Sequence, residues 1–262
     1  MKYGDLTYEE IRDRARQDWL AIIPTGCTEQ QGPHLPVDND TWFVERVCNA
    51  ASSKADADYG VQSLVLPTIP FGPTPEHRNY GAGYIDIPVE LHDSLVLSTL
   101  ESLTAQGFRK IVVWRGCGGH DLRETVKRFN ETYNEQSRAF LPGHPYHEVW
   151  RRIADLSVPG GHADSFTTSI MLHLRPEAVR KDRIVDPEHE PVDWEDPDLD
   201  FANYSSTGVI GDPTHASAEL GAKLWDAVVD EVAATLRSIA SCPETVPSVD
   251  VDKLHFLRRS KA

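Results

Sequence analysis

The chain has 262 residues, 40% of them hydrophobic and 26% charged, a composition typical of a soluble globular protein. Its formal net charge of −15 argues against a broad nucleic-acid surface, because phosphates require a positive field. No apolar run approaches the roughly 20 residues of a membrane span. The N-terminal residues lack a signal peptide's apolar centre, and the four cysteines form no CxxC pair. We therefore expect a cytoplasmic protein that binds neither nucleic acid nor membrane.

The first third of the chain alternates helical and apolar segments. A helix is predicted over residues 7–17, where Thr7 and Glu10 have the spacing of a capping box. A short buried strand follows at residues 19–24. Apolar residues three and four apart then predict a helix over 40–55, with Asp40 at its start as a plausible cap.

The same alternation continues through the rest of the chain. A second buried strand is predicted at residues 61–72, where it runs into a Pro-rich loop, and a third at 109–116. Helices are predicted over 88–107, 121–136 and 215–240. Strands that are apolar throughout and alternate with helices indicate an α/β fold whose parallel sheet is covered on both faces. We expect a single domain over 1–262, with a tail from about residue 242.

The loop after the first strand, "PTGCTEQQGPHLPVDND", carries residues typical of a metal site. Glu29 and Asp40 offer carboxylate oxygens, and His34 offers a nitrogen ligand or a proton carrier. Hydrogen bonding to loop backbone would explain the same two acids equally well. Gln31 is a poor ligand for a first-row metal because its amide is neutral and weakly basic.

The loop after the third predicted strand, "WRGCGGHD", is the second group of polar residues at a strand end. Ligands gather at the carboxyl ends of parallel strands, so both loops are expected to line one site. Cys117 is a candidate metal ligand or nucleophile, and the alternative is a small residue in the wall. Arg115 and His120 flank it, and the glycines allow close backbone approach to a ligand.

Two further segments add histidines. "PGGHADSFTTS" places His162 and Asp164 before a predicted helix, which makes His162 a candidate acid or base or, alternatively, a packing histidine. "PEHRNY" offers His77 and Arg78 in a loop expected to cover the same pocket. The aromatic residues Trp42, Phe71, Tyr80 and Trp114 suggest a partly aromatic pocket, and packing in the core explains the same residues equally well.

Together these segments resemble the creatininase (creatinine amidohydrolase) family from about Tyr8 to Ile239. The likeness rests on the two loops, on "GPTPEHRNY", on "GGHADSFTTS" and on "GVIGDPTHASAELG" near the end. It implies a compact three-layer α/β sandwich with a mainly parallel central sheet. It also implies a hexamer with two zinc or manganese ions per site, which hydrolyses cyclic or linear amides through a metal-activated water.

The resemblance carries over only part of that metal site. Glu29 and Asp40 match the family's glutamate and aspartate. Gln31 and Cys117 stand where the family has histidines, and Thr167 stands where it has a glutamate. Of five usual ligand positions, two keep their residue, so one divalent ion per subunit is expected, with no ion as the alternative.

Three functions follow. The first is a hydrolase of a C–N bond, or of a related carbonyl compound, that uses water activated by one zinc or manganese ion. Its ligands are expected among Glu29, Asp40, His120 and Cys117, and His162, which matches the family's proton-transfer histidine, would deliver a proton. In the second, Cys117 attacks directly, with His120 or His162 as base. The third is a non-catalytic homologue that binds a small molecule.

The expected partners are a small-molecule substrate and further copies of the chain. The resemblance implies a homo-oligomer, specifically a hexamer. The residues expected to contact the substrate are Arg115, Arg78, His77, Gln31, His34 and Asp164.

Overall fold

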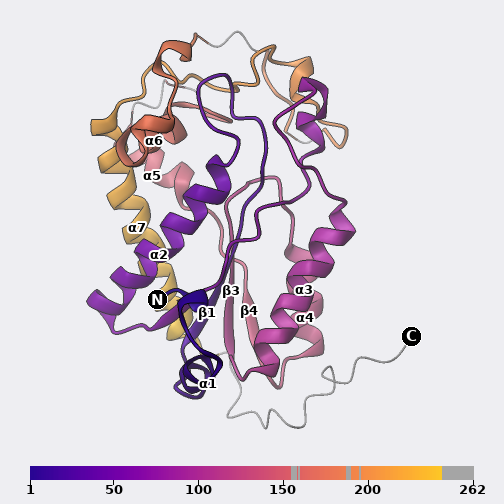
Figure 1. Cartoon of the computed structure of the whole chain (residues 1–262), viewed down its shortest axis with the longest axis vertical. Helices are drawn as coiled ribbons and strands as arrows, with labels where there is room; N and C mark the ends of the chain where they lie inside the picture. The colour runs from indigo at the N-terminus through magenta and orange to yellow at the C-terminus, as the bar shows by residue number, and fades with distance from the viewer. Residues whose placement is uncertain (155–157, 159, 187–189, 195, 244–262) are drawn as a thin grey trace.

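Four parallel strands form the central sheet of the computed structural model, in the order β2-β1-β3-β4 (Figure 1). The strands are β1 (Leu20–Thr25), β2 (Ser63–Val65), β3 (Lys110–Arg115) and β4 (Arg138–Phe140). The structure describes residues 1–154, 158, 160–186, 190–194 and 196–243. The predicted parallel sheet is confirmed, and β4 is an addition to it.

Helices cover both faces of the sheet, which makes three layers (Figure 1). One face carries α2 (Asn39–Tyr59), α5 (Tyr146–Ile153), α6 (Ser165–Leu174) and α7 (Ala218–Ala240). The other packs against α3 (Val89–Ala105) and α4 (Arg123–Thr132), with α1 (Tyr8–Arg16) at its lower end. The described residues also form short 3₁₀ helices. η1 (Tyr3–Asp5) precedes α1, and the others lie between the elements above: η2 (Pro75–Tyr80), η3 (Pro176–Ala178), η4 (Lys181–Arg183) and η5 (Phe201–Asn203).

The strand sequences explain the two cores. Successive side chains of a strand point to opposite faces, so neighbouring apolar residues serve different layers. Ile22 and Val112 join the core that contains α2 and α7. Ile23 and Val113 join the core that contains α3 and α4. A strand buried on both faces must be apolar throughout, as β1 and most of β3 are.

The ends of the elements differ from the predictions at several positions. The capping box of Thr7 and Glu10 is confirmed at the start of α1. The expected cap at Asp40 is wrong, because α2 begins at Asn39 after Asp38, which places Asp40 within the first turn. The predicted strand over 61–72 shortens to Ser63–Val65 because Pro67 and Pro70 follow it. The predicted tail lies outside the described residues from 244 onward.

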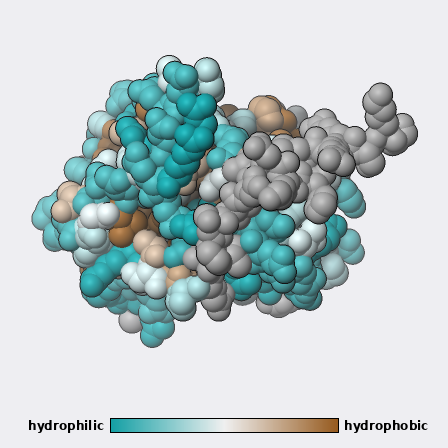
Figure 2. Space-filling view, turned by 90° about the horizontal axis from the view of Figure 1, so that it is seen from below, coloured by the Kyte–Doolittle hydropathy of each residue, from teal (hydrophilic) through white to brown (hydrophobic). Residues whose placement is uncertain are grey.

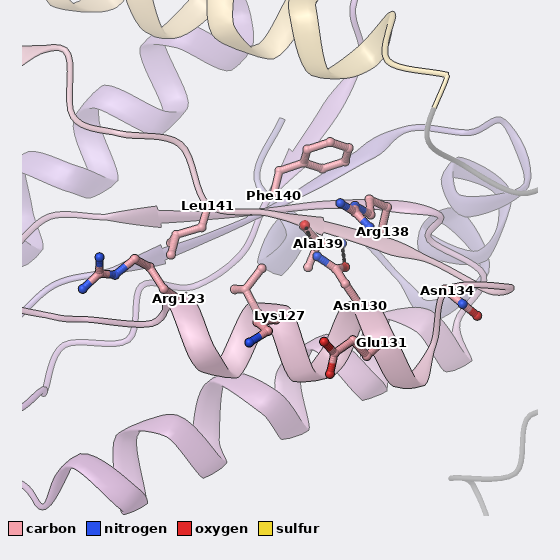
Figure 3. Close-up of a pocket in the computed structure, with 10 residues that line it drawn as sticks. Arg123, Lys127, Asn130, Glu131, Asn134, Arg138, Ala139, Phe140 and Leu141 are labelled. Atoms are coloured by element: carbon pink, nitrogen blue, oxygen red, sulfur yellow. Dashed lines mark hydrogen bonds between the residues drawn. The ribbon is translucent and has the colours of Figure 1, made fainter.

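The outer edge of the sheet is closed by a side chain. A hollow of about 670 Å³ lies between α4 and β4 (Figure 3). There the Asn130 amide accepts a hydrogen bond from the Ala139 N–H at 2.8 Å and donates one to the Ala139 carbonyl at 2.9 Å. Both backbone groups of Ala139 are thereby paired, so this part of the edge offers no free hydrogen bonds to another strand.

The surface seen from below is mainly hydrophilic. Apart from the grey atoms, hydrophilic residues cover most of this face, with small hydrophobic patches between them (Figure 2). Within the described part of the chain, no helix combines the length and apolarity needed to cross a membrane.

Candidate active site

The sheet brings the two polar loops together at the end opposite α1 (Figure 1). β1 and β3 are hydrogen-bonded neighbours, and their last residues, Thr25 and Arg115, pair with each other. The loops that follow therefore start side by side. They border a cavity of about 810 Å³, whose wall includes Glu29, Asp40 and Cys117.

Glu29 and Asp40 form a carboxyl pair in the cavity wall. The Gln31 side chain joins them, because its Nε2 donates to Glu29 Oε1 at 3.3 Å and to Asp40 Oδ2 at 3.2 Å. The Cys27 thiol donates to the same Asp40 oxygen at 3.2 Å. Gln31 thus lies in the site as a donor that orients the two acids.

Burial makes this pair costly to ionise. It raises the pKa of Glu29 to about 7. The pKa of Asp40 is also raised to about 7, first by burial and then by the neighbouring charge of Glu29. Two adjacent buried carboxylates repel each other, and a divalent cation bound between them would offset that repulsion and the cost of their burial.

Gln30, which lies between Glu29 and Gln31 in the sequence, orients two histidines. Its side-chain oxygen accepts from the Gly32 N–H at 2.9 Å, and its Nε2 donates to the Gly208 carbonyl at 3.1 Å, which fixes the amide orientation. The same Nε2 lies 3.0 Å from His77 Nδ1, so His77 Nδ1 is the acceptor. The main-chain carbonyl of Gln30 lies 2.7 Å from His162 Nε2, which must therefore be the donor.

The two imidazoles consequently present opposite groups to Glu29. Burial lowers the pKa of His77, and it lowers that of His162 to about 3, so both rings are neutral near pH 7. His162 then directs an unprotonated Nδ1 to within 3.6 Å of Glu29 Oε1. His77 directs a protonated Nε2 to within 3.4 Å of Glu29 Oε2. One histidine can accept a proton here, and the other can donate one.

The cysteines of the two loops lie beside the carboxyl pair. Cys117 Sγ is 4.0 Å from Glu29 Oε2. The neighbouring Cys27 side chain is the strongest single influence on the Cys117 pKa and lowers it, but burial and the charges of Glu29 and Asp40 raise it to about 11. A thiol with so high a pKa is protonated at neutral pH, which makes it a weak nucleophile.

Several residues expected to contact a substrate do not border the cavity. Arg78 pairs with Asp86, and His34 bonds Thr168 through Nε2 at 2.8 Å. The Arg115 guanidinium donates from Nη1 to the His120 carbonyl at 2.7 Å. His120 itself lies behind the cavity wall with 1% of its surface exposed.

The other predicted residues do border it: Gln31, Asp40, Glu29, His77, Cys117, His162 and Asp164. The Asp164 carboxylate, however, accepts from the backbone N–H of Gly161 at 2.8 Å and of Thr167 at 3.1 Å. Its main role is therefore to cap α6.

The sequence predicted three features of this site incompletely. Cys27, in a loop beside other polar residues, had a claim on a functional role but was not chosen as a ligand, although it precedes Glu29 by two residues. Glu76, whose Oε1 is 3.6 Å from His77 Nε2, carried no signal beyond its place before His77. None of the four expected aromatic residues lines the cavity, because Trp114 enters the core and Tyr80 donates to the Ser205 carbonyl. The aromatic residues that do line it are Phe43, Tyr146, Trp150, Phe166, Trp194 and Phe201.

Three groups of candidate metal ligands occur among the described residues, each with its ligand atoms within 4.8 Å of one another. They are Cys27–Glu29–Asp40–Cys117, Cys27–Cys117–His120 and Glu29–His77–His162. The first combines oxygen and sulfur donors, which fits zinc better than manganese. The third fits poorly, because the His77 nitrogen that faces Glu29 carries a proton.

The parallel sheet, with carboxylate, thiol and imidazole groups gathered at its carboxyl end, defines an α/β protein with candidate metal-ligand groups at the place where such folds bind ligands. A family model described as creatininase, or creatinine amidohydrolase, matches residues 4–236. The chain belongs to the creatininase family, whose members are hydrolases.

Relatives and solved structures agree with this assignment. The mycofactocin precursor peptide peptidase of Mycobacterium tuberculosis H37Rv is 31% identical over 219 residues, covering 80% of this chain and 81% of the relative. The 3-dehydro-scyllo-inosose hydrolase of Thermotoga maritima is 25% identical, covering 90% and 83%. A solved creatininase mutant of Zn–Zn type is 22% identical, covers 92% of this chain and 98% of its own, and has a TM-score of 0.79. The predicted family and fold are confirmed.

Proposed function

We propose that this protein hydrolyses a C–N bond of an amide or peptide, using water activated at one divalent metal ion. The observation that carries the proposal is the Glu29–Asp40 carboxyl pair, which faces the cavity and is oriented by Gln31. A mycofactocin precursor peptide peptidase and a creatinine amidohydrolase, both relatives by sequence, are named for cleaving such bonds.

Glu29, Asp40 and Cys117 are the residues that would hold the ion. When bound, zinc would lower the pKa of a water molecule to about 7 and polarise the scissile carbonyl. Each carboxyl group loses its proton as the ion binds, which removes the cost of burying two adjacent charges. Gln31 keeps both carboxylates turned toward the cavity through its two hydrogen bonds.

The histidines supply the proton transfers. His162 would take a proton from the attacking water at its free Nδ1 and give it to the leaving nitrogen, while its Nε2 stays bonded to the Gln30 carbonyl. Because burial lowers the pKa of His162 to about 3, the protonated ring is a strong acid that gives up its proton readily. His77 keeps its Nε2 proton, which lies 3.4 Å from Glu29 Oε2 without a hydrogen bond of good geometry. The ring therefore stabilises negative charge at the cavity wall.

Direct attack by Cys117 has less support. No imidazole is hydrogen-bonded to its thiol among the described residues, and the thiol pKa is raised to about 11. A nucleophilic cysteine instead needs a lowered pKa and an adjacent base.

The test is hydrolysis of a panel of short peptides and cyclic amides by protein stripped with a chelator and reloaded with Zn²⁺. Activity should follow zinc content, and the Glu29→Gln and Asp40→Asn variants should each lose it by roughly 10²-fold or more. Glu124→Gln, on the exposed face of α4, is the matched control and should behave as the wild type. Activity that is unaffected by stripping and by both variants would refute the proposal.

We also propose a homo-oligomer, with a hexamer as the expected state. Light scattering coupled to size-exclusion chromatography measures the mass directly. A mass equal to the 29.3 kDa of one chain would refute this expectation.

A further inference from the structure

We propose that Cys27, Cys117 and His120 form a second, sulfur-rich metal site behind the carboxyl pair, suited to a soft divalent ion such as Zn²⁺. One ligand atom from each residue lies within 4.8 Å of the other two. This inference goes beyond hydrolysis, because capture of an ion here requires no substrate.

The fold brings the three side chains together from both loops. Cys27 follows β1, and Cys117 and His120 follow β3, so the Thr25–Arg115 pairing of the two strands places the loops in contact. Cys27 is fully buried, Cys117 is 7% exposed and His120 is 1% exposed. The group therefore forms one enclosed cluster next to the cavity.

His120 is the residue that points to a ligand. Its side chain is buried, yet neither Nδ1 nor Nε2 has a hydrogen-bond partner of good geometry among the described residues, and only the Pro73 backbone carbonyl lies near enough to act on the ring as an acceptor. A buried imidazole normally pairs both nitrogens, since desolvation without compensation is unfavourable. Burial also lowers the pKa of His120 to about 3, so the ring is neutral and offers a lone pair.

The surrounding backbone is shaped to admit this ring. A Cβ atom at Gly72 would lie 2.2 Å from Cε1 of His120, so only glycine at residue 72 leaves space for the imidazole. The Arg115 guanidinium holds the His120 carbonyl at 2.7 Å, which fixes the backbone on the other side. The position of the ring is thus determined by the loop after β2, which contains Gly72, and by Arg115 at the end of β3.

The donor set selects the class of ion. Two sulfurs and one imidazole nitrogen favour zinc or another soft ion over manganese or magnesium, which prefer oxygen ligands. Both thiols would release their protons to solvent as the ion binds. Cys117 borders the cavity, which gives the ion a route inward, and its sulfur lies within reach of both sites.

The first test uses the wild-type protein and cadmium alone. The ¹¹³Cd NMR spectrum of chelator-stripped protein loaded with Cd²⁺ should contain a resonance in the range of two thiolate ligands. A spectrum restricted to the range of oxygen and nitrogen donors would overturn the proposal. This measurement does not depend on whether any variant folds.

The second test assigns the ligands with Co²⁺. Titration should produce a sulfur-to-cobalt charge-transfer band, which Cys27→Ser should roughly halve and which Cys242→Ser, the control outside the cluster, should leave unchanged. His120→Gln should weaken Co²⁺ binding by about tenfold or more. A band unchanged in both Cys27→Ser and His120→Gln would overturn the proposal.

A third arm separates this site from the hydrolytic one. The Glu29→Gln/Asp40→Asn double variant should lose hydrolysis but retain the sulfur-to-cobalt band. If that band disappears with the carboxylates, the thiols belong to a single shared site and the proposal fails. If hydrolysis is never found while the band is present, only the proposed function fails.

Discussion

The side-chain nitrogen of Gln30, Nε2, lies 3.0 Å from His77 Nδ1, and the main-chain carbonyl oxygen of Gln30 lies 2.7 Å from His162 Nε2. Gln30 therefore keeps both imidazoles protonated at Nε2. His77 faces Glu29 with this protonated nitrogen, whereas His162 faces Glu29 with its unprotonated Nδ1. Gly208 makes this possible: its φ is +79°, and a Cβ atom there would lie 2.0 Å from Gln30 Oε1.

Gln30 should control the protonation of His77. Long-range ¹H–¹⁵N spectra of the wild type should show both His77 and His162 protonated at Nε2. Gln30→Glu replaces the donor at His77 Nδ1 with an acceptor, so His77 should change to the Nδ1–H form. His162 should stay protonated at Nε2, because the main-chain carbonyl at residue 30 is unchanged. A wild-type spectrum with His77 protonated at Nδ1 would contradict the assignment.

His162 should be needed for proton transfer but not for metal binding. We expect His162→Asn to reduce kcat by roughly 10²- to 10⁴-fold while the zinc content stays at the wild-type level. His215→Asn, a largely exposed histidine beside Asp212, is the control. Loss of zinc from His162→Asn, measured by elemental analysis, would instead make this residue a ligand.

The stability of metal-free protein should depend on the carboxyl pair. The folded pKa values of Glu29 and Asp40 are about 7, above their ordinary values of 4.5 and 3.8. Between about pH 4 and 7 the native state thus binds more protons than the unfolded state, so ionisation of the pair lowers stability as pH rises. Zinc should reverse this trend, because it binds the ionised form.

Thermal unfolding at pH 5.5 and 7.5 tests this linkage. Chelated wild type should lose more stability between these values than the Glu29→Gln/Asp40→Asn variant, by a few °C in Tm. The gain in Tm on adding Zn²⁺ should be larger at pH 7.5. Equal pH dependence of the two chelated proteins would show that the pair does not titrate in this window.

Asn130 should stabilise the sheet edge. Asn130→Ala removes both hydrogen bonds to Ala139, so we expect it to lower the free energy of unfolding by about 1–2 kcal/mol. Urea denaturation measures the change. Asn134→Ala, on an exposed position of the same segment (Figure 3), should cost much less; equal losses would remove the role assigned to Asn130.

Local patterns were enough to predict most of the fold. Apolar runs and helical periodicity located β1, β3 and the long helices, and the Thr7–Glu10 spacing located the start of α1. β4 and α5 were missed because three residues in Arg138–Phe140 and eight in Tyr146–Ile153 are too few for a reliable period.

The site was less predictable, because side-chain direction in loops depends on tertiary contacts. Because both loops follow predicted parallel strands at their carboxyl ends, the sequence implied that Glu29, Asp40 and Cys117 would meet. It could not indicate that Arg78 pairs with Asp86, or that the loop at Gly72 covers His120. His120 consequently groups with Cys27 and Cys117, and no group of candidate ligands among the described residues combines it with Glu29 or Asp40.

The pairing of Thr25 with Arg115 fixes the spacing of the candidate ligands but not their chemical identity. Every candidate ligand from Cys27 to Asp40 is positioned by its distance along the chain from Thr25, and Cys117 and His120 by theirs from Arg115. Exchanging a thiol, amide or imidazole within these loops changes the ion that fits and leaves the frame intact. Inserting one residue at the end of β1 or β3 would displace the ligands of one loop relative to those of the other. The site should therefore tolerate substitutions of its ligands far better than insertions between the strand ends and the ligands.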